Sequence, residues 1–537
     1  MSSAVSALPD DIESLKALVL EQAGQLQDVT EHVAQLTADN ARYQARILTL
    51  TEQLNLALAR RYAARSEKIS PDQLPLFDEA EVEAADADID LQEEDGDAEA
   101  GAGADTVEIA SHTRNRRGRK PLPESLPRVE VVHDLPEAER VCPHDGQALK
   151  EIGETVCEQL DIVPATIRVI RHIRRKYACD CGQCIKTAPL APQPIPKSLA
   201  APGLLAHVAV SKYQDALPLY RQEQILTRIG VDIPRATLAH WMIRAGDLVQ
   251  PLINLLRDTL LGYDVIQMDE TPVQVLKEPG KTPQSKSYLW VQRGGPPDRP
   301  VLLYDYDPSR SGAVPRRLLA DYTGTLQTDG YEGYRAVVEA NGIHHVGCMA
   351  HARRRFADAV KAQGKKKKAG VAQHGLALIQ KLYRIEKQAR DLAPKDRKAY
   401  RDCHARPVLD KLRAWLDTQL PQVPPQTATG KALNYLNDQW GRLVRYLDDG
   451  RIEIDNNRTE NAIRPFVVGR KNWLFSDSVK GVTASANLYS LIETAKANGL
   501  EPYAYLCEAF TRLPTAATVA DFEALLPFNI DTDRIGD

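Results

Sequence analysis

The sequence predicts a multidomain α+β protein, and three features of its hydrophobic pattern lead to this prediction. Apolar residues first repeat about every 3.5 residues over 15–54, and two later segments, 203–250 and 361–446, have the spacing of helices. Between those two segments, from Gly262 onward, the period changes to that of β-strands. We therefore expect a central mixed sheet, with helical segments before it and inserted into it.

Composition and charge exclude some classes of protein. No apolar run approaches the roughly 18 residues that span a bilayer, and Met1–Leu15 lacks the basic start and apolar stretch of a secretory signal. We expect a cytoplasmic protein with no membrane partner. The net charge of −5 conceals an uneven distribution: 13 acidic residues and no Lys or Arg lie between Asp78 and Asp105, so the rest of the chain is mildly basic.

Residues 1–62 are expected to form a coiled coil, because the steps between seam residues alternate between four and three. Asn40 falls at an a position, where a buried Asn favours a two-stranded parallel pair. The alternative is one long amphipathic helix that packs on its own core. The seam consists of Leu15, Val19, Gln22, Leu26, Val29, Val33, Leu36, Asn40, Tyr43, Ile47, Leu50 and Leu54.

An acidic segment and a basic arm come next. Residues 63–112 are rich in Ala, Asp, Glu and Gly and are expected to be disordered. The arm, 113–128, can lie in a narrow minor groove, where guanidinium groups meet strong negative potential. It can equally be a solvated linker. Its basic residues are Arg114, Arg116, Arg117, Arg119 and Lys120.

Residues 129–195 have the cysteine spacing of a zinc-ribbon-like module, with a strand expected over 159–171 between two knuckles. Cysteines in a chain without a secretory signal favour a metal site over a disulfide framework. The second knuckle has good C-x2-C spacing, whereas Asp145 stands where the first knuckle would carry its second cysteine. The ligand set is therefore open. The candidate ligands for a structural Zn²⁺ are Cys142, His144, Cys179, Cys181 and Cys184.

Residues 200–256 are expected to contain a helix-turn-helix. Helices over 204–213, 218–229 and 235–244 are separated by short loops, the last of which is Gly230–Pro234. On the third helix, Leu238, Trp241 and Met242 are expected in the core, and a helical hairpin without a DNA role is the alternative. The residues expected to face a major groove are Arg235, Thr237 and His240.

The segment from 257 to 358 carries the first two candidate catalytic residues. Strands are expected over 263–276, 287–293 and 299–306, then a helix over 314–319 and a strand over 324–331. Asp269 lies on the first of these strands and Asp329 at the end of the fourth. Three strands, a helix and a further strand, with Asp on the first and fourth, is the order of an RNase H-like sheet.

A third carboxylate lies in the second part of the expected core, 447–490. Asp455 can cap a helix that carries Glu460 in its second turn, and Pro465 is expected to end or kink that helix. If Asp269, Asp329 and Glu460 converge, they form an oxygen-ligand site suited to Mg²⁺ or Mn²⁺. Two such ions about 4 Å apart can activate an attacking oxygen and stabilise a leaving one in phosphodiester displacement.

Other residues of interest flank these carboxylates. Cys348 and His351 form a C-x2-H pair that is half of a zinc site, but we favour a role in supporting the core. Residues 353–355, all Arg, could face phosphates or solvent. Residues 359–446 are expected to be an all-α insertion, with a Lys run at 365–368 exposed on a loop. Beyond Glu460, the residues expected to contact DNA are Arg470, Lys471 and Trp473, although Trp473 could equally be buried.

These motifs together resemble the large DDE transposase of bacterial insertion-sequence family sixty-six, the TnpC type. The resemblance covers nearly the whole chain, and its most specific parts are Gln267–Val273, Thr328–Tyr331, Gly347–Phe356 and Asp455–Trp473. It implies that Asp269, Asp329 and Glu460 are the metal-binding triad. It also implies a nucleoid-associated protein that binds double-stranded DNA at the terminal inverted repeats and cleaves it, then transfers the freed strand to target DNA.

Two other functions compete with a transposase. A catalytically inactive, domesticated DNA-binding regulator needs only the arm, the zinc module and the helix-turn-helix, and does not explain why all three carboxylates are present. A scaffolding protein built on the coiled coil leaves both the basic arm and the Asp-bearing strands unexplained. The resemblance further implies a homodimer or higher oligomer through the coiled coil, and accessory proteins encoded by the same element.

The expected domain organisation is a coiled coil (1–62), a linker (63–112), a basic arm (113–128), a zinc-binding-like module (129–195), a helix-turn-helix region (200–256), a first part of the catalytic core (257–358), a helical insertion (359–446), a second part of the core (447–490) and a C-terminal helical region (491–537).

Overall fold

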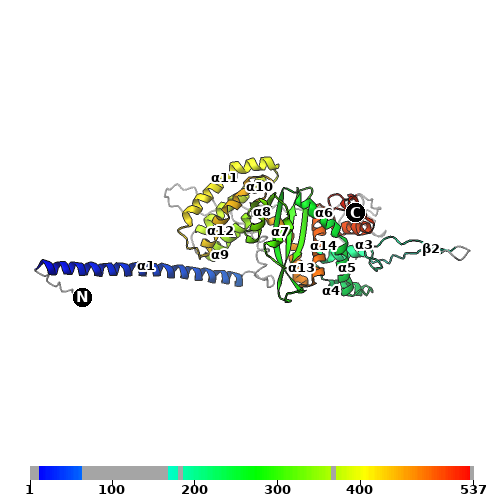
Figure 1. Cartoon of the computed structure of the whole chain (residues 1–537), viewed down its shortest axis with the longest axis horizontal. Coiled ribbons are helices and arrows are strands. Elements are labelled where there is room, and N and C mark those ends of the chain that lie inside the picture. The colour runs from blue at the N-terminus through cyan, green and yellow to red at the C-terminus, as the bar shows by residue number, and fades with distance from the viewer. Residues whose placement is uncertain (1–10, 63–166, 179–184, 364–369, 533–537) are drawn as a thin grey trace, which may run out of the picture. The chain divides into compact units, whose positions relative to one another are not determined.

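The computed structural model describes residues 11–62, 167–178, 185–363 and 370–532 (Figure 1). The chain divides into two compact units, Ala87–Leu190 and the remainder, which are described separately below. Several sequence predictions lie outside the described residues. These are the acidic linker, the basic arm with Arg114, Arg116, Arg117, Arg119 and Lys120, the candidate zinc ligands Cys142, His144, Cys179, Cys181 and Cys184, and the Lys run at 365–368.

In the unit Ala87–Leu190, the described residues contain one antiparallel hairpin. Its strands are β1 (Lys176–Ala178) and β2 (Ile185–Thr187), paired so that Lys176 is opposite Thr187. In sequence, the C-x2-C pair of the expected second knuckle lies between these two strands. The strand predicted over 159–171 is wrong for 167–171, which have no regular structure. The first strand in the described part of this unit instead begins at Lys176.

The heptad region forms a single long helix, α1 (Ile12–Tyr62). Its seam residues are largely exposed in the monomer: Val19 is 61% exposed, Leu26 69% and Ile47 64%. Near its C-terminal end, the helix contacts the rest of its unit. The Asn55 side-chain amide donates to the Ala362 carbonyl at 2.9 Å, and Glu52 accepts the Ala428 N–H at 2.7 Å. Most of the apolar seam therefore has no intramolecular partner among the described residues.

Between residue 200 and the sheet, the described residues form four helices; the first three correspond to those predicted over 204–213, 218–229 and 235–244, and the fourth was not predicted. They are α3 (Pro202–Tyr213), α4 (Leu219–Arg228), α5 (Arg235–Leu248) and α6 (Gln250–Leu261). Pro202 and Pro234 mark the starts of α3 and α5, where a missing N–H costs nothing. Leu238, Trp241 and Met242 are buried, as predicted for the core side of α5.

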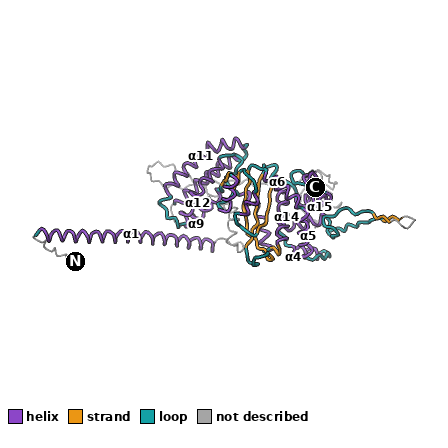
Figure 2. The backbone as a smooth tube through the Cα atoms, viewed as in Figure 1, coloured by secondary structure: helices purple, strands orange, loops and turns teal. Residues whose placement is uncertain are grey.

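The central sheet, whose strands are orange in Figure 2, combines antiparallel and parallel pairing. Its strand order is β5-β4-β3-β6-β7. Strands β3, β4 and β5 form an antiparallel meander, whereas β6 and β7 run parallel to β3. A short strand, β8, pairs with the far end of β3. The strands are β3 (Val265–Lys277), β4 (Lys286–Gly294), β5 (Val301–Asp307), β6 (Thr325–Gln327), β7 (His344–Val346) and β8 (Ser476–Ser478).

Short helices connect β5 to β6 and β6 to β7. They are α7 (Ala313–Leu319), the 3₁₀ turn η2 (Glu332–Tyr334) and α8 (Arg335–Asn341). The strand predicted to end at Asp329 is shorter than expected, since β6 ends at Gln327. Asp329 therefore lies in the loop that follows β6, where its Oδ1 accepts the Tyr331 N–H at 2.9 Å.

Between β7 and the segment that carries Glu460, the described regular structure is helical and has its own hydrophobic core. That core includes Phe356, Leu382 and Leu436, all fully buried. Arg401 is also fully buried and is neutralised by Glu386, whose Oε2 lies 2.7 Å from an Arg401 nitrogen. The elements are α9 (Met349–Gln363), α10 (Val371–Ala389), α11 (Pro394–Gln419), α12 (Ala428–Leu443) and the 3₁₀ turn η3 (Val444–Leu447).

The C-terminal part returns to the sheet and completes the larger core (Figure 1). Helices α13 and α14 pack against the antiparallel strands, and α15 packs against α3. Helix α5 crosses α14 so closely that a Cβ on Gly246 would lie 2.5 Å from the Ala484 Cβ, so only glycine fits there. The elements are α13 (Asn457–Trp473), α14 (Val479–Ala497), α15 (Pro502–Arg512), the 3₁₀ turn η4 (Leu513–Thr515) and α16 (Val519–Glu523).

Helix α14 also covers the edge strand β5, whose outer backbone groups have no neighbouring strand. Thr494 Oγ1 accepts the Leu302 N–H at 3.0 Å and donates to the Leu302 carbonyl at 2.9 Å. Ser490 Oγ accepts the Tyr304 N–H at 2.8 Å. These two hydroxyl side chains replace a missing strand, which both satisfies buried backbone groups and protects the sheet edge.

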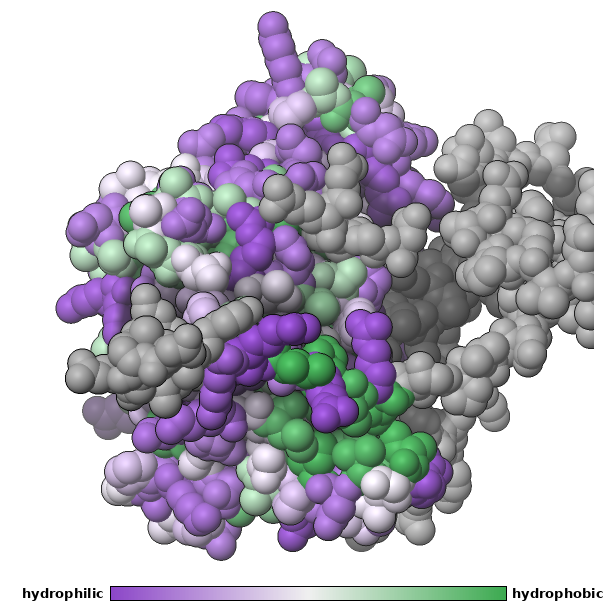
Figure 3. Space-filling view, turned by 90° about the vertical axis from the view of Figure 1, so that its right-hand side faces the viewer, coloured by the Kyte–Doolittle hydropathy of each residue, from purple (hydrophilic) through white to green (hydrophobic). Residues whose placement is uncertain are grey.

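On the face shown in Figure 3 the surface is mainly hydrophilic, and hydrophobic side chains gather mainly in one area. In the part of the chain that the structure describes, no helix combines the length and the apolar character needed to cross a membrane.

We expect Thr494→Val to destabilise the protein by about 1–3 kcal/mol, because the isosteric side chain leaves the buried Leu302 N–H and carbonyl without partners. Urea denaturation followed by circular dichroism measures the change. The matched control is Thr511→Val, since Thr511 is exposed and bonds only within its own helix. Equal stability of the two variants would contradict this account of the sheet edge.

Candidate active site

Strand pairing places Asp329 near Asp269. Strands β3 and β6 are parallel, with Val265 opposite Thr325 and Gln267 opposite Gln327. Continuing this register by two residues leads from Gln267 to Asp269 and from Gln327 to Asp329. Both Asp residues are half-buried. The two carboxylates, 60 positions apart in the sequence, therefore lie at one end of the parallel part of the sheet.

Glu460 reaches the same region because the start of α13 is bonded to β3. The Asn456 amide donates to the Met268 carbonyl at 3.0 Å, and the Thr459 hydroxyl donates to Gln267 Oε1 at 3.2 Å. Asn456 and Thr459 are fully buried. Since Met268 and Gln267 immediately precede Asp269, these bonds fix Glu460 close to that residue.

Two predictions about this helix are wrong in detail. Asn456, not Asp455, is the residue before the first helical position, and Glu460 lies in the first turn rather than the second. Asp455 does accept the Asn457 N–H at 3.1 Å. For Pro465 the prediction was an end or a kink of the helix; the helix does not end there, since it continues to Trp473 with the proline inside it.

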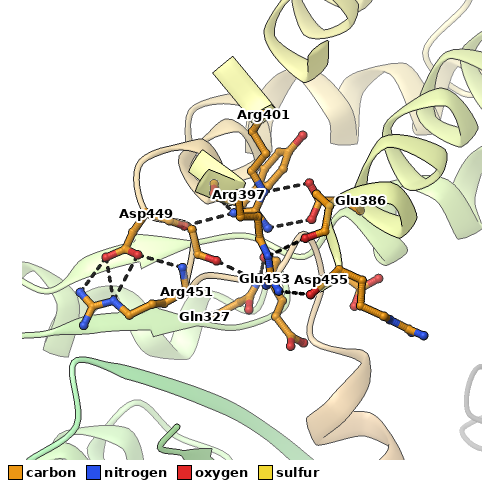
Figure 4. Close-up of polar contacts among 12 residues, drawn as sticks. Gln327, Glu386, Arg397, Arg401, Asp449, Arg451, Glu453 and Asp455 are labelled. Carbon is orange, nitrogen blue, oxygen red and sulfur yellow. Dashed lines mark hydrogen bonds and ion pairs between the residues drawn. The ribbon is translucent and has the colours of Figure 1, made fainter. Parts of the chain in front are cut away.

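A polar network holds the chain segment that leads into α13 (Figure 4). The buried Gln327 donates to the Glu453 carbonyl at 2.8 Å and accepts from the Gln267 amide at 2.7 Å. From the helical core, Arg401 donates to the Tyr446 and Asp449 carbonyls at 2.8 and 3.1 Å. The segment 446–456 is therefore fastened both to the sheet and to α11, which limits where Glu460 can lie.

A fourth carboxylate, Glu270, lies beside the three that the sequence singles out. Its side chain is 1% exposed and is paired with Arg310 at 2.5 Å, and it accepts a hydrogen bond from the Tyr334 hydroxyl at 2.9 Å. Sequence reasoning recognised Glu270 only as part of a motif. Because its charge is already neutralised by Arg310, we assign it to the support of the site.

Negative charge is concentrated here beyond what the local cations neutralise. Burial raises the pKa of the Asp269 carboxyl well above its ordinary value, and the charges of Glu270, Glu460 and Asp329 raise it further. Burial also raises the pKa of Glu460, although Arg354 opposes that shift. Carboxylates that disfavour one another's ionisation are suited to a bound cation, and oxygen ligands fit Mg²⁺ or Mn²⁺. The residues present therefore fit a divalent metal.

The structure does not bring the three carboxylates into one tight group. The described part of the chain does contain a group of three residues that could bind a metal, namely Cys348, His351 and Glu460. Their ligand atoms all lie within 4.8 Å of one another. Asp269 and Asp329 are electrostatic neighbours of Glu460 but do not belong to that group.

Helix α9 provides the other neighbours of Glu460. Arg354 Nη2 lies 3.0 Å from Glu460 Oε2, and His351 Nδ1 lies 3.8 Å from Oε1. Burial, reinforced by Arg354, lowers the pKa of His351 to about 4, so the imidazole is neutral near pH 7. Arg353 and Arg355 instead lie over the rings of Tyr383 and Tyr435. The role of Arg354 was missed from the sequence, where the three arginines are indistinguishable.

The residues predicted to contact DNA differ in exposure. Arg235 and His240 are exposed and Thr237 is half-buried on α5. Arg470 is buried, and its guanidinium donates to Thr271 Oγ1 at 3.3 Å, so it points into the fold.

Two neighbours of Arg470 also differ in exposure. Lys471 is exposed. Trp473 is half-buried, packs near Tyr489 and lies under the Lys212 ammonium, 4.2 Å from its ring centroid.

Comparison with known proteins identifies the family. Residues 197–484, more than half of the chain, match the family described as "Transposase IS66 family". The chain belongs to this family. The same protein matches "zinc-finger binding domain of transposase IS66" over 139–182, "IS66 C-terminal element" over 490–528 and "Transposase C of IS166 homeodomain" over 49–131. The resemblance inferred from the sequence motifs is thereby confirmed across the chain.

Several relatives of this IS66-family protein occur in Sinorhizobium fredii (strain NBRC 101917 / NGR234). "Uncharacterized protein y4jD" is 35% identical over 77% of this chain and 82% of its own length. "Uncharacterized protein y4qI" is 32% identical over 99% of both chains. "Uncharacterized protein y4hP" is 29% identical over 79% of each. The similarity to y4qI thus extends over the whole length of both proteins.

We expect Asp269→Asn to stabilise the metal-free protein at neutral and higher pH. The fold raises the pKa of this carboxyl, so its favourable contribution is present below the ordinary value of 3.8 and is lost as pH rises through the raised value. The wild type should therefore lose stability with rising pH more steeply than the variant does. Thermal unfolding measured from about pH 5 to about pH 9 gives the difference in stability between the two proteins.

The same variant should lose stabilisation by Mg²⁺, because a ligand that binds only the folded state stabilises it by an amount that grows with the logarithm of its affinity. Asp321→Asn, at an exposed position, is the control and should behave as the wild type. A variant less stable than the wild type across this pH range would show that Asp269 is a structural residue.

Proposed function

We propose that this protein is a DDE transposase that binds the terminal inverted repeats of its insertion sequence and catalyses metal-dependent DNA cleavage and strand transfer. The observation that supports the proposal is the effect of the Asp329 and Glu460 charges on the Asp269 carboxyl, where β3, β6 and α13 meet. Membership of a transposase family gives that arrangement its chemical context.

The sheet topology supports an RNase H-like core. Three antiparallel strands are followed by two that run parallel to the first, with one carboxylate on β3 and another just after β6. In this proposal the residues from 359 to 446 are an insertion between the two parts of the core. Its separate hydrophobic cluster and its bonds to the 446–456 segment support that division.

Mg²⁺ or Mn²⁺ bound by the three carboxylates would lower the pKa of the attacking water or hydroxyl and stabilise the charge on the leaving oxygen. The protein itself positions the carboxylates on rigid elements. Because Arg354 binds Glu460 Oε2, this carboxylate has a positive partner that compensates its burial in the metal-free chain. Glu460 would turn toward Asp269 and Asp329 in the assembled site.

DNA recognition in this proposal uses several surfaces. The N-terminal part of α5, with the exposed Arg235 and His240 and the half-buried Thr237, is available to a major groove, and Lys471 is available to phosphates. Arg470 is excluded from phosphate contact in this proposal, because it is buried. The basic arm, the zinc-finger region and additional proteins from the same element complete the set of proposed contacts and partners.

Self-association through α1 would pair two element ends. The exposed apolar seam of α1, from Val19 to Leu54, is the surface that a second copy would cover. A buried Asn40 at the centre of the pair would fix its register and favour a parallel dimer.

Asp269→Asn and Glu460→Gln should each reduce cleavage of labelled element ends by on the order of a thousandfold or more, while end binding is retained. A gel-based cleavage assay with Mg²⁺ and a mobility-shift assay on the same DNA give the two measurements. Asp477→Asn, at a carboxylate 63% exposed on β8, is the matched control and should cleave normally. Undiminished cleavage by both triad variants would refute the assignment.

Arg235→Ala and His240→Ala should weaken binding to the element end and relax its sequence preference if α5 reads a major groove. If Arg235 contacts a phosphate instead, binding should weaken on all sequences, and the slope of log K against log salt should fall by about 1. Fluorescence anisotropy at several salt concentrations distinguishes contact with base edges from contact with phosphates. Lys411→Ala, on the exposed face of α11, is the control; equal effects from this control would remove α5 from the interface.

A further inference from the structure

Cys348, His351 and Glu460 meet at a place where two helices begin. Cys348 immediately precedes α9, His351 lies in its first turn, and Glu460 lies in the first turn of α13. The two helix starts are bonded to each other, since Met349 N–H donates to the Ile454 carbonyl at 3.1 Å. Partial positive charge at both helix starts favours anionic ligands between them.

The sulfur of Cys348 is fully enclosed and accepts backbone hydrogen bonds. Asn456 N–H lies 3.2 Å from it, and the His351 N–H also donates to it. Cys348 is 1% exposed. Burial, with the charges of Glu460 and Asp455, raises the pKa of this thiol well above its ordinary value, and the two N–H donors only partly oppose that shift.

The facing atoms of the other two residues lack hydrogen-bond partners. His351 Nδ1 and Glu460 Oε1 are both buried without one among the described residues, and they lie 3.8 Å apart, too far for a hydrogen bond between them. The Glu460 side chain is only 4% exposed. Two buried polar atoms directed at one another across such a gap need a third partner.

We propose that Cys348 Sγ, His351 Nδ1 and Glu460 Oε1 bind one thiophilic divalent cation, Zn²⁺, with a fourth position open to water. These atoms already lie within 4.8 Å of one another. Bond lengths of about 2.0–2.3 Å to tetrahedral zinc require separations of roughly 3.3–3.6 Å, so small side-chain movements suffice. Binding releases the thiol proton to solvent, and the thiolate and carboxylate then neutralise the ion.

The ligand chemistry separates this site from the oxygen-ligand site. A thiolate and an imidazole select zinc-like ions, whereas Mg²⁺ prefers carboxylates and water. Arg354 does not obstruct the site, because it binds the other Glu460 oxygen, Oε2. Since Glu460 also belongs to the proposed catalytic triad, the two ions would compete for one carboxylate. That consequence rests on the proposed function, whereas the binding test below does not.

The test uses Co²⁺, which accepts the same ligands as zinc and gives a thiolate-to-cobalt charge-transfer band. The full-length chain carries Ser in place of Cys142, Cys179, Cys181 and Cys184, which lie in the other compact unit. Titration without DNA or Mg²⁺ should give this band at one equivalent of Co²⁺, and Zn²⁺ should displace it. Because no cleavage is measured, loss of the proposed function leaves the result unaffected.

Additional Cys348→Ser should abolish the band, whereas additional Cys403→Ser, at an exposed thiol on α11, should leave it unchanged. His351→Asn retains the thiol and should weaken Co²⁺ binding at least about tenfold. If circular dichroism shows that Cys348→Ser does not fold, the Co²⁺ affinity of His351→Asn tests the proposal instead. Absence of the band in the parent chain, its survival in folded Cys348→Ser, or unchanged affinity in His351→Asn would each overturn the proposal.

Discussion

The attachment of the start of α13 to β3 is the constraint on which the candidate site depends. Two buried side chains, Asn456 and Thr459, bond to the backbone and side chain of the strand immediately before Asp269. A buried hydrogen bond to a neighbouring element is costly to lose, because the partner left behind is desolvated. This attachment therefore holds an acidic residue next to other acidic residues, although their charges repel one another.

The two hydrophobic cores have different roles in this arrangement. The larger core contains the sheet with α13 and α14, and α14 supplies the hydroxyl groups that satisfy the edge of β5. The smaller core of helices supports the segment before α13 through Arg401, which is buried and neutralised by Glu386. The position of Glu460 therefore depends both on β3, to which the start of α13 is bonded, and on the helical core, which holds the segment before α13 through Arg401.

Glu460 has two sets of neighbours that favour different cations. One set is Asp269 and Asp329, the proposed oxygen ligands, and the other is the thiol of Cys348 and the imidazole of His351. Arg354 supplies a positive charge to the same carboxylate. In the two proposals taken together, Glu460 would be a ligand to either ion, one at a time.

The sequence alone determined the family, the order of β3, β4, β5, α7 and β6, and which carboxylates to consider, because local periodicity and short motifs are contained in contiguous residues. It identified the buried face of α5 and the strand that carries Asp269. It misplaced the start of α13, since capping by Asp455 or Asn456 is locally equivalent, and it placed Arg470 at the surface although that residue is buried. Only the tertiary structure selected Arg354 from three adjacent arginines and joined Cys348 to Glu460, because these contacts link residues more than 100 positions apart.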